Sequence, residues 1–511
     1  MKTQRIQFTE WMPDQPDIAS GGFAGCENAI PGDNGYRAGY SWSLVKSFNA
    51  ATAETTTRGV YSTRDFTGEG TTFIGTPSNL YEVTDDAGNS ATSYNVSATG
   101  GYSQPFEDFV GFWDFTERDG TVFAANGIEE IQSRDITDRG NQFSTLAATG
   151  GPVTAKTIGA AKNFLIAGNI VDSDGTTPNR VRWPSITDPT DWVVSAATQA
   201  DFQDLKVSGG SVQKIVGGEY AIVFQQRAVF RMTYVGVPLV WQFDEIAGAN
   251  GTYHPLSVVR VGGDIYYYSR DGFRVILNGS QPVSIGEGKV DQWVTQYDAF
   301  AYKNSVKGAY DAERNIILWS FPSTIIAYDI ARNKFGHIQG VDAASGLPYV
   351  TEFMLGNSGT LADPDDVVAV VYSDAISAST ATISVYSNEG LTGDYNSSVE
   401  SAKVELAPGR NALVTGVTAG RASNWSYEGS SQTSSLNVTV TGYETPYDRS
   451  GSTSSESVSG TPGVQVRRYS VRKNGRFHKV KIDWDGPLRQ EKRFPDIVSW
   501  ADVHYAESHK R

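Results

Sequence analysis

The stretch "GGDIYYYSRDGFRVILNGS", Gly262–Ser280, contains two apolar runs separated by an Arg-Asp-Gly sequence. An Asp-Gly pair between two apolar runs is one of the strongest local signals for a β-hairpin, because glycine accepts the positive φ that a tight turn requires. The stretch therefore predicts two paired strands joined at Asp271-Gly272.

The same pairing of two apolar runs recurs along the chain. Its turns fall near Pro77, Asn126-Gly127, Gly175, Gln226, Asp271-Gly272, Pro322-Ser323 and Ser377, a spacing of about fifty residues. Helical periodicity is almost absent between the turns. A unit of this length holds four short strands, which is one blade of a β-propeller. A long array of β-sandwiches is the alternative.

The fold class predicted is therefore all-β, a β-propeller of six or seven blades with a small C-terminal β platform domain. The seventh repeat is the least regular, because "GNSGTLADPDDV" interrupts it. We expect residues 1–50 to form an extended segment that packs on or closes the propeller, residues 51–388 to form the propeller, and residues 389–511 to form the platform or docking domain. Within the last, residues 420–463 are rich in Ser, Thr and Gly, but the alternation in "SLNVTVTGY" predicts some strand there.

Composition limits the environment and the chemistry. The single cysteine, Cys26, excludes an intrachain disulfide framework and is expected to be a small buried hydrophobe. The N-terminal residues lack the apolar core of a signal peptide, and no apolar run is long enough to span a membrane. These features predict a protein made in a cytoplasm, not exported by that route and not inserted in a membrane.

Motifs of catalysis are hard to find. The chain has five histidines, none of them in an H-E-x-x-H sequence, and neither a phosphate-binding P-loop nor a G-x-S-x-G sequence occurs. We therefore predict that the protein is not an enzyme and has no catalytic residue, cofactor or metal site. Asp172 and Asp174 before Gly175 resemble the start of a calcium loop, but the rest of the loop is missing and a solvated turn is favoured. "YSRDGF" resembles the aspartate box of sialidase propellers but lacks its Thr-Trp ending, which favours an ordinary hairpin turn.

Charge is segregated along the chain. The formal net charge is −15, whereas the residues from Val464 onward carry twelve Lys or Arg against six Asp or Glu. There "VQVRRYSVRKNGRFHKVKIDW" alternates basic and apolar residues at the period of a strand. It could contact nucleic-acid phosphates, but a sheet face that meets an acidic neighbouring subunit or adaptor is favoured. The candidate docking residues are Arg467, Arg468, Arg472, Lys473, Arg476, Lys479 and Lys481.

Three regions together resemble the nozzle, or tail hub, proteins of podovirus-type bacteriophages. They are "WMPDQPDIASGGFAGCENAIPGDNGYRA" near the N-terminus, "VRWPSITDPTDW" leading into "DLKVSGGSVQKIVGGEYAIVFQQRAVFRM", and "LAPGRNALVTGV" followed by "RRYSVRKNGRFHKVKIDW". Their order covers nearly the whole chain, although each motif is degenerate. The C-terminal "VSWADVHYAESHKR" departs from the Gly-Arg pair on which members often finish, which puts that final contact in doubt.

The resemblance implies a structural virion protein with a propeller body and a platform domain. It implies a homohexameric ring below the portal and its adaptor, which retains packaged double-stranded DNA, conducts it out at infection and docks tail fibres or a needle. The protein would be assembled in the host cytoplasm and reside in the phage tail. A negative channel wall would repel DNA phosphates and give no sequence-specific binding. Candidate acidic residues in lumen loops are Glu287, Asp291, Asp363, Asp365 and Asp366.

The alternative function is a carbohydrate-binding or glycan-cleaving propeller that acts as a receptor-binding protein. A glycosidase needs two carboxylates about 5–10 Å apart in a cleft, and the sequence cannot pair its acids. A propeller scaffold for cellular partner proteins is a third, weaker reading. Trp183, Trp192 and Trp241 are expected to pack between blades rather than against a sugar.

Overall fold

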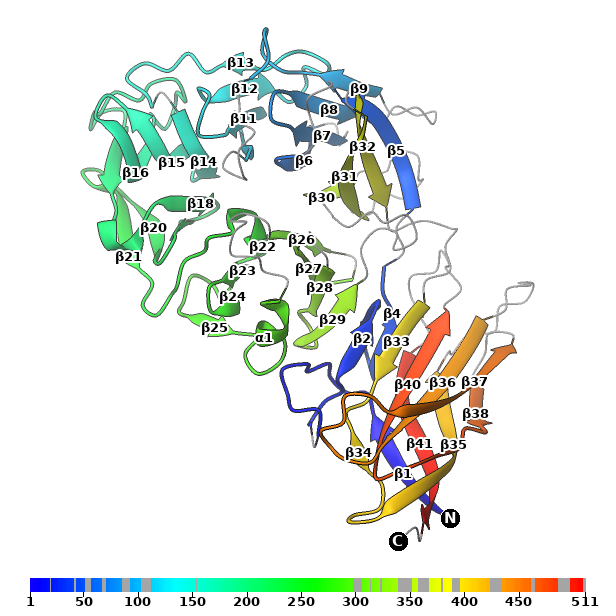
Figure 1. The fold of residues 1–511 in the computed structure, drawn as a ribbon. Coiled ribbons are helices and arrows are strands. Elements are labelled where there is room, and N and C mark those ends of the chain that lie inside the picture. Colours follow the sequence, from blue (N-terminus) through cyan, green and yellow to red (C-terminus); the bar gives the residue numbers. More distant parts are fainter. Residues whose placement is uncertain are drawn as a thin grey trace.

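The fold is described from a computed structural model of the whole chain. The structure describes residues 1–508 except for residues 19, 41–42, 51–56, 67–69, 85–91, 103–111, 153, 297–305, 313, 322–323, 339–351, 357–366, 378–379, 388–395, 423–433, 461–464 and 486–496. The described residues form a β-propeller of seven four-stranded blades and a β-sandwich beside it (Figure 1). The expected β-propeller with a C-terminal β domain is thereby confirmed, with seven blades.

Each of the seven predicted hairpins is the second and third strand of one blade. Blade one consists of β6 (Val60–Arg64), β7 (Gly70–Gly75), β8 (Leu80–Thr84) and β9 (Thr92–Asn95). Blade two consists of β10 (Asp114–Arg118), β11 (Thr121–Ala125), β12 (Gln132–Asp135) and β13 (Ser144–Thr145). Blade three consists of β14 (Thr154–Ala161), β15 (Phe164–Asp172), β16 (Gly175–Trp183) and β17 (Asp201–Asp204). Blades four and five consist of β18 (Val212–Val216), β19 (Ala221–Gln225), β20 (Val229–Gly236) and β21 (Val240–Glu245); and β22 (Val259–Val261), β23 (Asp264–Ser269), β24 (Gly272–Ile276) and β25 (Pro282–Ser284). Blades six and seven consist of β26 (Lys307–Asp311), β27 (Ile316–Phe321), β28 (Thr324–Asp329) and β29 (Lys334–Ile338); and β30 (Glu352–Gly356), β31 (Val367–Ser377), β32 (Thr380–Ser387) and β5 (Ser43–Ala50).

The two middle strands of a blade are apolar throughout because both faces of the blade are covered. Every residue of β27 and β28 is buried. Ile317, Trp319 and Ile326 belong to a core shared with blade five, whereas Ile316 and Leu318 belong to a core on the opposite face. Burial on both faces explains why the hairpins are visible in the sequence as continuous apolar runs.

Blade seven is closed by a strand from the N-terminal part of the chain. β5 pairs antiparallel with β32, from Ala381 opposite Ala50 to Ser387 opposite Ser43. Residues 43–50 therefore belong to the propeller, which was expected to begin at residue 51. The irregular stretch in the seventh repeat falls between β30 and β31, at residues that lie outside the described part of the chain.

The sandwich consists of two facing sheets built from both ends of the chain. One contains β1 (Lys2–Gln7), β4 (Gly35–Ala38), β41 (Ile497–Ser508), β35 (Asn411–Ala422), β38 (Gln465–Tyr469) and β39 (Lys473–Gly475). The other contains β2 (Gly25–Glu27), β33 (Asn396–Glu400), β34 (Val404–Glu405), β40 (Phe477–Asp485), β36 (Ser434–Tyr443) and β37 (Ser452–Gly460). The Ser-, Thr- and Gly-rich section thus contains the strands β36 and β37.

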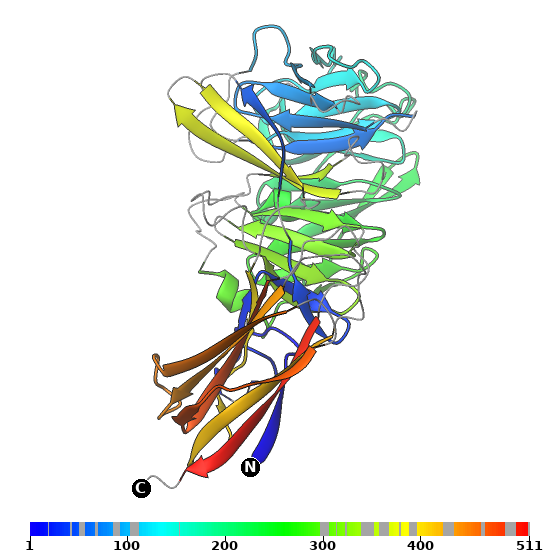
Figure 2. The same cartoon turned by 90° about the vertical axis from the view of Figure 1, so that its right-hand side faces the viewer.

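The two parts are joined by strand pairing. β3 (Ala29–Gly32) pairs with β29 of blade six at His337 opposite Ala29, and with β4, which pairs in turn with β41. A single sheet therefore runs from the propeller into the sandwich, which projects from it (Figure 2). Trp11, Phe23 and Tyr36 belong to an apolar core that includes Phe273 and Trp319 of the propeller and the interior of the sandwich.

Helix is scarce in the described part of the chain. The helical segments found there are η1 (Val207–Gly209), η2 (Pro255–Ser257) and α1 (Asp291–Val294). Among the residues described, none of these helices reaches the length and apolarity needed to cross a membrane.

Candidate interaction surfaces

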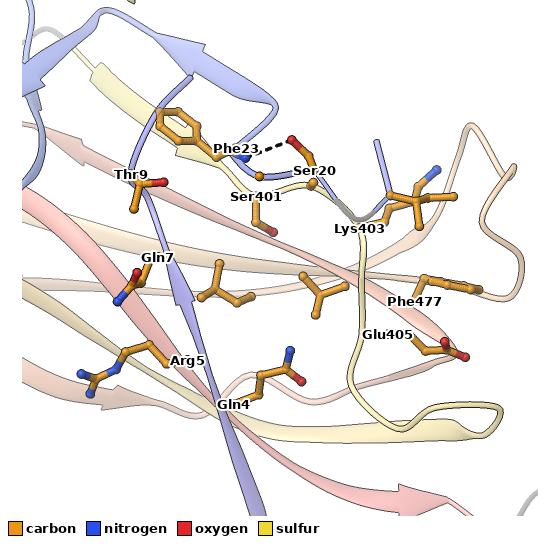
Figure 3. A pocket seen from close by; sticks show the side chains of 16 residues that line it. Gln4, Arg5, Gln7, Thr9, Ser20, Phe23, Ser401, Lys403, Glu405 and Phe477 are labelled. Atoms are coloured by element: carbon orange, nitrogen blue, oxygen red, sulfur yellow. Dashed lines mark hydrogen bonds between the residues drawn. The ribbon is translucent and has the colours of Figure 1, made fainter. Parts of the chain in front are cut away.

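A groove of about 470 Å³ opens on one side of the sandwich, between β1 and β34 (Figure 3). Residues 4–7 of β1 line one wall, residues 401–405 with Phe477 line the other, and Ile18 with residues 20–23 lies at one end. Gln4 lies on the β1 side, and Glu405 and Phe477 lie across from it (Figure 3). The groove is therefore bordered by the edge strands of both sheets.

Half of the main-chain groups of β1 face away from its partner. β1 pairs antiparallel with β41, with Ile6 opposite Ala501, and the ladder continues where the Phe8 N–H donates to the Ser499 carbonyl oxygen at 2.9 Å. Alternate residues of an antiparallel strand direct both main-chain groups to the same side. The main-chain groups of Thr3, Arg5 and Gln7 therefore point away from β41 and are available to another strand.

The charged side chains around the groove already have partners. Arg5 donates to the Asp502 carboxylate at 2.7 Å and lies over the Trp500 ring at 4.3 Å. The Lys403 ammonium donates to main-chain carbonyl oxygens of Pro446 and Asp448 at 3.0 and 2.9 Å. What the groove offers a ligand is hydrogen bonding by main-chain and uncharged groups, a chemistry suited to an extended peptide.

Glu405, which also lines the groove, has hydrogen-bond partners within the chain as well. Its carboxylate accepts from Arg476 and from the Gly409 N–H, both at 2.9 Å. The hydrogen bond from Arg476 lowers the pKa of Glu405. A carboxylate stabilised in its charged form is a poor general acid at neutral pH.

The predicted basic docking residues divide into two groups. The members on β40 bind acids of the same chain: Lys479 lies 2.9 Å from Asp17 and 3.3 Å from Glu400, and Lys481 lies 3.0 Å from Asp483. Arg476, which precedes β40, binds Glu405 as described. The acidic neighbour expected for this stripe is thus partly the chain itself.

The other members lie on the opposite side of the sandwich, near β37. Arg468 and Arg472 are exposed, and among the described residues no carboxylate lies within ion-pair distance of either guanidinium. The Lys473 ammonium donates to the Thr453 carbonyl oxygen at 3.5 Å. The side chain of Arg467 lies outside the described residues, although β38 includes its main chain.

Of the predicted lumen acids, the structure describes Glu287 and Asp291, which lie near each other in the segment after β25. Glu287 is exposed in the loop after β25, and Asp291 begins α1. The Asp291 carboxylate accepts from the Phe273 N–H at 3.1 Å, and burial raises its pKa to about 7. Asp363, Asp365 and Asp366 lie outside the described residues, so a lumen role for these acids stays a prediction.

The loop that holds Asp291 contacts the N-terminal segment instead of standing free. The Asp14 carboxylate accepts from the N–H groups of Gln292 and Trp293 at 2.9 and 2.7 Å, which caps α1. The Trp11 and Trp293 rings meet edge to face at 4.9 Å. The sequence analysis expected the N-terminal segment to pack on the propeller but did not identify these contacts, although Trp11 and Asp14 stand in the first region of resemblance.

The axis of the propeller is crossed by side chains. The Asp114 carboxylate of β10 accepts from the Thr157 hydroxyl of β14 at 2.6 Å and binds the Lys214 ammonium of β18, so it links three neighbouring blades. Lys307 of blade six lies 5.8 Å from the Phe112 ring, which precedes blade two on the other side of the axis. The centre of the propeller is therefore occupied in part by side chains of different blades.

The possible calcium loop and the possible aspartate box are both ordinary turns in the structure. Arg180 donates to the Asp172 and Asp174 carboxylates at 3.1 and 2.6 Å, which places an arginine where a calcium ion would lie. In the described residues, no group of three or more His, Cys, Asp or Glu side chains could hold a metal ion. "YSRDGF" forms the turn between β23 and β24, where Gly272 has a φ of +100°.

The remaining sequence predictions on single residues are confirmed. Cys26 is buried, and burial raises its pKa to about 12. Trp183 and Trp241 share a core of blades three and four, and Trp192 lies in a core of blades two and three, so all three pack between blades.

Comparisons with known proteins find similar solved structures but no matching sequence. No family profile and no curated protein matches the sequence. Among solved structures, the chain is similar to the WD40 β-propeller domain of Doa1, with 8% identity over 68% of this chain and 97% of that chain and a TM-score of 0.41. It is also similar to the AfRom2 CNH domain, with 12% identity over 68% of this chain and 98% of that chain and a TM-score of 0.39.

Proposed function

We propose that the chain is a structural virion protein that forms a homohexameric tail nozzle, or tail hub, of a podovirus-type phage. The ring would extend the channel of the portal and adaptor, help to retain packaged double-stranded DNA, conduct it out at infection and dock tail fibres or a needle. No catalytic role is proposed. The observation that supports this function is the placement of the three resembling regions.

Those regions fall in the parts that the resemblance implies. The first provides β2, β3, β4 and the junction with α1; the second runs from the end of β16 into blade four; and the third provides β35, β38, β39 and β40 of the sandwich. A propeller body and a β platform are thus present, and the junction between them is made by the first region.

The charge and the filled axis are compatible with a passage between copies. Each chain carries −15, so a ring of copies would be strongly acidic and would repel phosphate instead of retaining DNA by contact. Because Lys307 and Phe112 approach across the propeller axis, the passage would lie at the centre of the ring and not inside a subunit.

A carbohydrate-binding or glycan-cleaving propeller is the alternative. Sugar sites commonly present aromatic ring faces, but Trp183, Trp192 and Trp241 are each buried, with no more than 4% of the residue exposed. No observation in the described residues favours this alternative specifically.

Electron microscopy of the phage particles that contain the chain, labelled with an antibody against it, tests the proposal. We expect the label at the distal end of the tail. Particles made without the chain should fail to retain their DNA. Label on fibres only, or an unlabelled particle together with a purified chain that binds or cleaves a glycan, would contradict the proposal.

A further inference from the structure

Two turns of blade six share a sequence pattern and a geometry. "YDAERN" joins β26 to β27, and "YDIARN" joins β28 to β29. In each turn the arginine donates to the aspartate three residues earlier, at 3.0 Å from Arg314 to Asp311 and at 2.6 Å from Arg332 to Asp329. The aspartates are buried, whereas the arginine side chains are 21% and 32% exposed. Because the first and third turns of a four-stranded antiparallel sheet lie at the same end, both guanidinium groups lie at one end of the blade.

A third arginine, Arg37, belongs to a strand of the same sheet. β3 pairs with both β29 and β4, so β4 is the second strand beyond the edge of blade six. Arg37 stands directly opposite Ile30, which belongs to the core that includes Leu318 of blade six. Residues directly opposite each other in an antiparallel pair lie on one face of the sheet. The Arg37 side chain therefore lies on the face that carries this core.

The segment around Arg37 contacts both turns, and its contacts engage the nearby acids. The Tyr40 hydroxyl donates to the Asp311 carboxylate at 2.5 Å, and Arg332 donates to Asp33 in the turn between β3 and β4. Arg37 itself makes no ion pair or hydrogen bond with a described residue. Its Nε is buried without a partner, whereas its two terminal nitrogens are not among the buried unpartnered atoms and so reach solvent.

The charges around Arg37 favour an anion. Burial lowers the pKa of Arg37, and repulsion by Arg314 and Arg332 lowers it further. Tyr40 and Asp329 offset only part of this effect. A desolvated cation without a counter-ion is costly, and an anion bound beside it would recover that cost. The parallel N–H groups of a guanidinium match two oxygens of a phosphate.

We propose that Arg37, flanked by Arg314 and Arg332, binds a phosphate dianion at the junction between the propeller and the sandwich. The terminal nitrogens of Arg37 hold two phosphate oxygens. The two flanking guanidinium groups favour a doubly charged anion over a singly charged carboxylate. The site goes beyond the proposed function and does not rest on it, because it is formed within one copy of the chain.

Thermal unfolding of the purified full-length chain at about pH 8, where phosphate is mostly doubly charged, tests the site. Increasing concentrations of sodium phosphate replace sodium chloride at constant ionic strength. We expect the melting temperature to rise with the phosphate concentration, since a ligand that binds the folded state stabilises it. Sodium acetate, which supplies a carboxylate, should give a much smaller rise.

Two matched variants assign the effect to Arg37. Arg37→Met keeps a long side chain without the charge and should weaken the apparent affinity for phosphate at least about tenfold. Arg270→Met removes an exposed guanidinium from the turn between β23 and β24 and should leave the phosphate effect unchanged. Arg37→Lys, which keeps the charge but not the paired donors, replaces the methionine variant if that one does not fold, and should also bind phosphate more weakly.

Phosphorus NMR of phosphate mixed with the folded protein gives a readout that does not depend on unfolding. The phosphate signal should broaden with the wild type and with Arg270→Met, but not with Arg37→Met. Glycerol 3-phosphate separates two sources of the ligand. A rise in melting temperature that depends on Arg37 extends the site to phosphate monoesters, and the lack of a rise restricts it to free phosphate.

Three results would overturn the site. They are an equal phosphate effect in the wild type and Arg37→Met, an equal effect of acetate and phosphate, and no effect of phosphate on either melting or line width. None of them bears on the proposed function, which depends on the label at the tail tip.

Discussion

Asp291 shows how a buried acid at the junction couples stability to pH. Its carboxylate accepts from the Phe273 N–H, lies near Asp14 and Glu287, and is partly balanced by Arg274. A Cβ on Gly272 or Gly286 would come within 2.2 Å of this carboxylate, so both glycines are needed for its close packing. Burial raises the pKa of Asp291 to about 7, from an ordinary value of 3.8.

The sign of the pH dependence follows from that shift. The folded state binds the Asp291 proton more tightly than the unfolded chain does, so the contribution of this residue to stability is full below about pH 4 and is lost as the pH rises to about 7. Asp291→Asn should lack this part of the pH dependence. The difference in the free energy of unfolding between the variant and the wild type should therefore shift in favour of the variant by about 2 kcal/mol from pH 5 to pH 8. Urea unfolding at the two pH values checks it, with the exposed Asp138→Asn as control. An identical pH dependence in Asp291→Asn and wild type would contradict the prediction.

The Glu82–Arg134 pair tests how neighbouring blades are held together. Glu82 of β8 and Arg134 of β12 lie 2.7 Å apart and are almost fully buried, and Arg134 stacks over Phe73 and Phe143. Arg134→Met leaves a buried carboxylate without its cation, which should cost about 3–5 kcal/mol in the free energy of unfolding. Adding Glu82→Leu should recover most of that loss. The exposed pair of Lys206 and Glu245 is the control, because Lys206→Met should cost less than about 1 kcal/mol. Equal losses in the two single variants would refute the prediction.

At the scale of elements, the sequence predicts what local pairing determines. The hairpins of the seven blades are visible because a turn residue separates two strands that are adjacent in sequence. Gly272 has the positive φ that its turn requires. The Asn126 side chain accepts hydrogen bonds from the N–H groups of Ile128 and Glu129 in its own turn. The candidate residues were less predictable, because their partners lie far away in the chain. Asp14 caps α1 from a distance of 278 residues, and the pairing of Lys479 with Asp17 depends on the same folding-back of the N-terminal segment. No local sequence pattern predicts such contacts.

For the whole molecule, the continuous sheet and the shared core predict that propeller and sandwich unfold together. Trp11 is 1% exposed, packs on Trp293, and its indole N–H donates to the Ala24 carbonyl oxygen at 3.1 Å. Calorimetry of the wild type should show one transition. Trp11→Ala should cost about 3–5 kcal/mol and separate the melting of the two parts. Trp183→Ala removes an equally buried ring from blades three and four and should destabilise the protein without that separation. Two transitions in the wild type would contradict the prediction.

The strand β5 also sets the order in which the molecule can be completed during translation. It is synthesised before the strands of six other blades, yet its partner β32 is synthesised only after them. Until then the propeller is not closed, and the blades at its two ends each have an apolar face without a neighbouring blade. The partner of β1, β41, is synthesised later still. A chain that stops before β32 lacks the partner of β5, so we expect it to be cleaved by proteases more readily than a chain that includes β32.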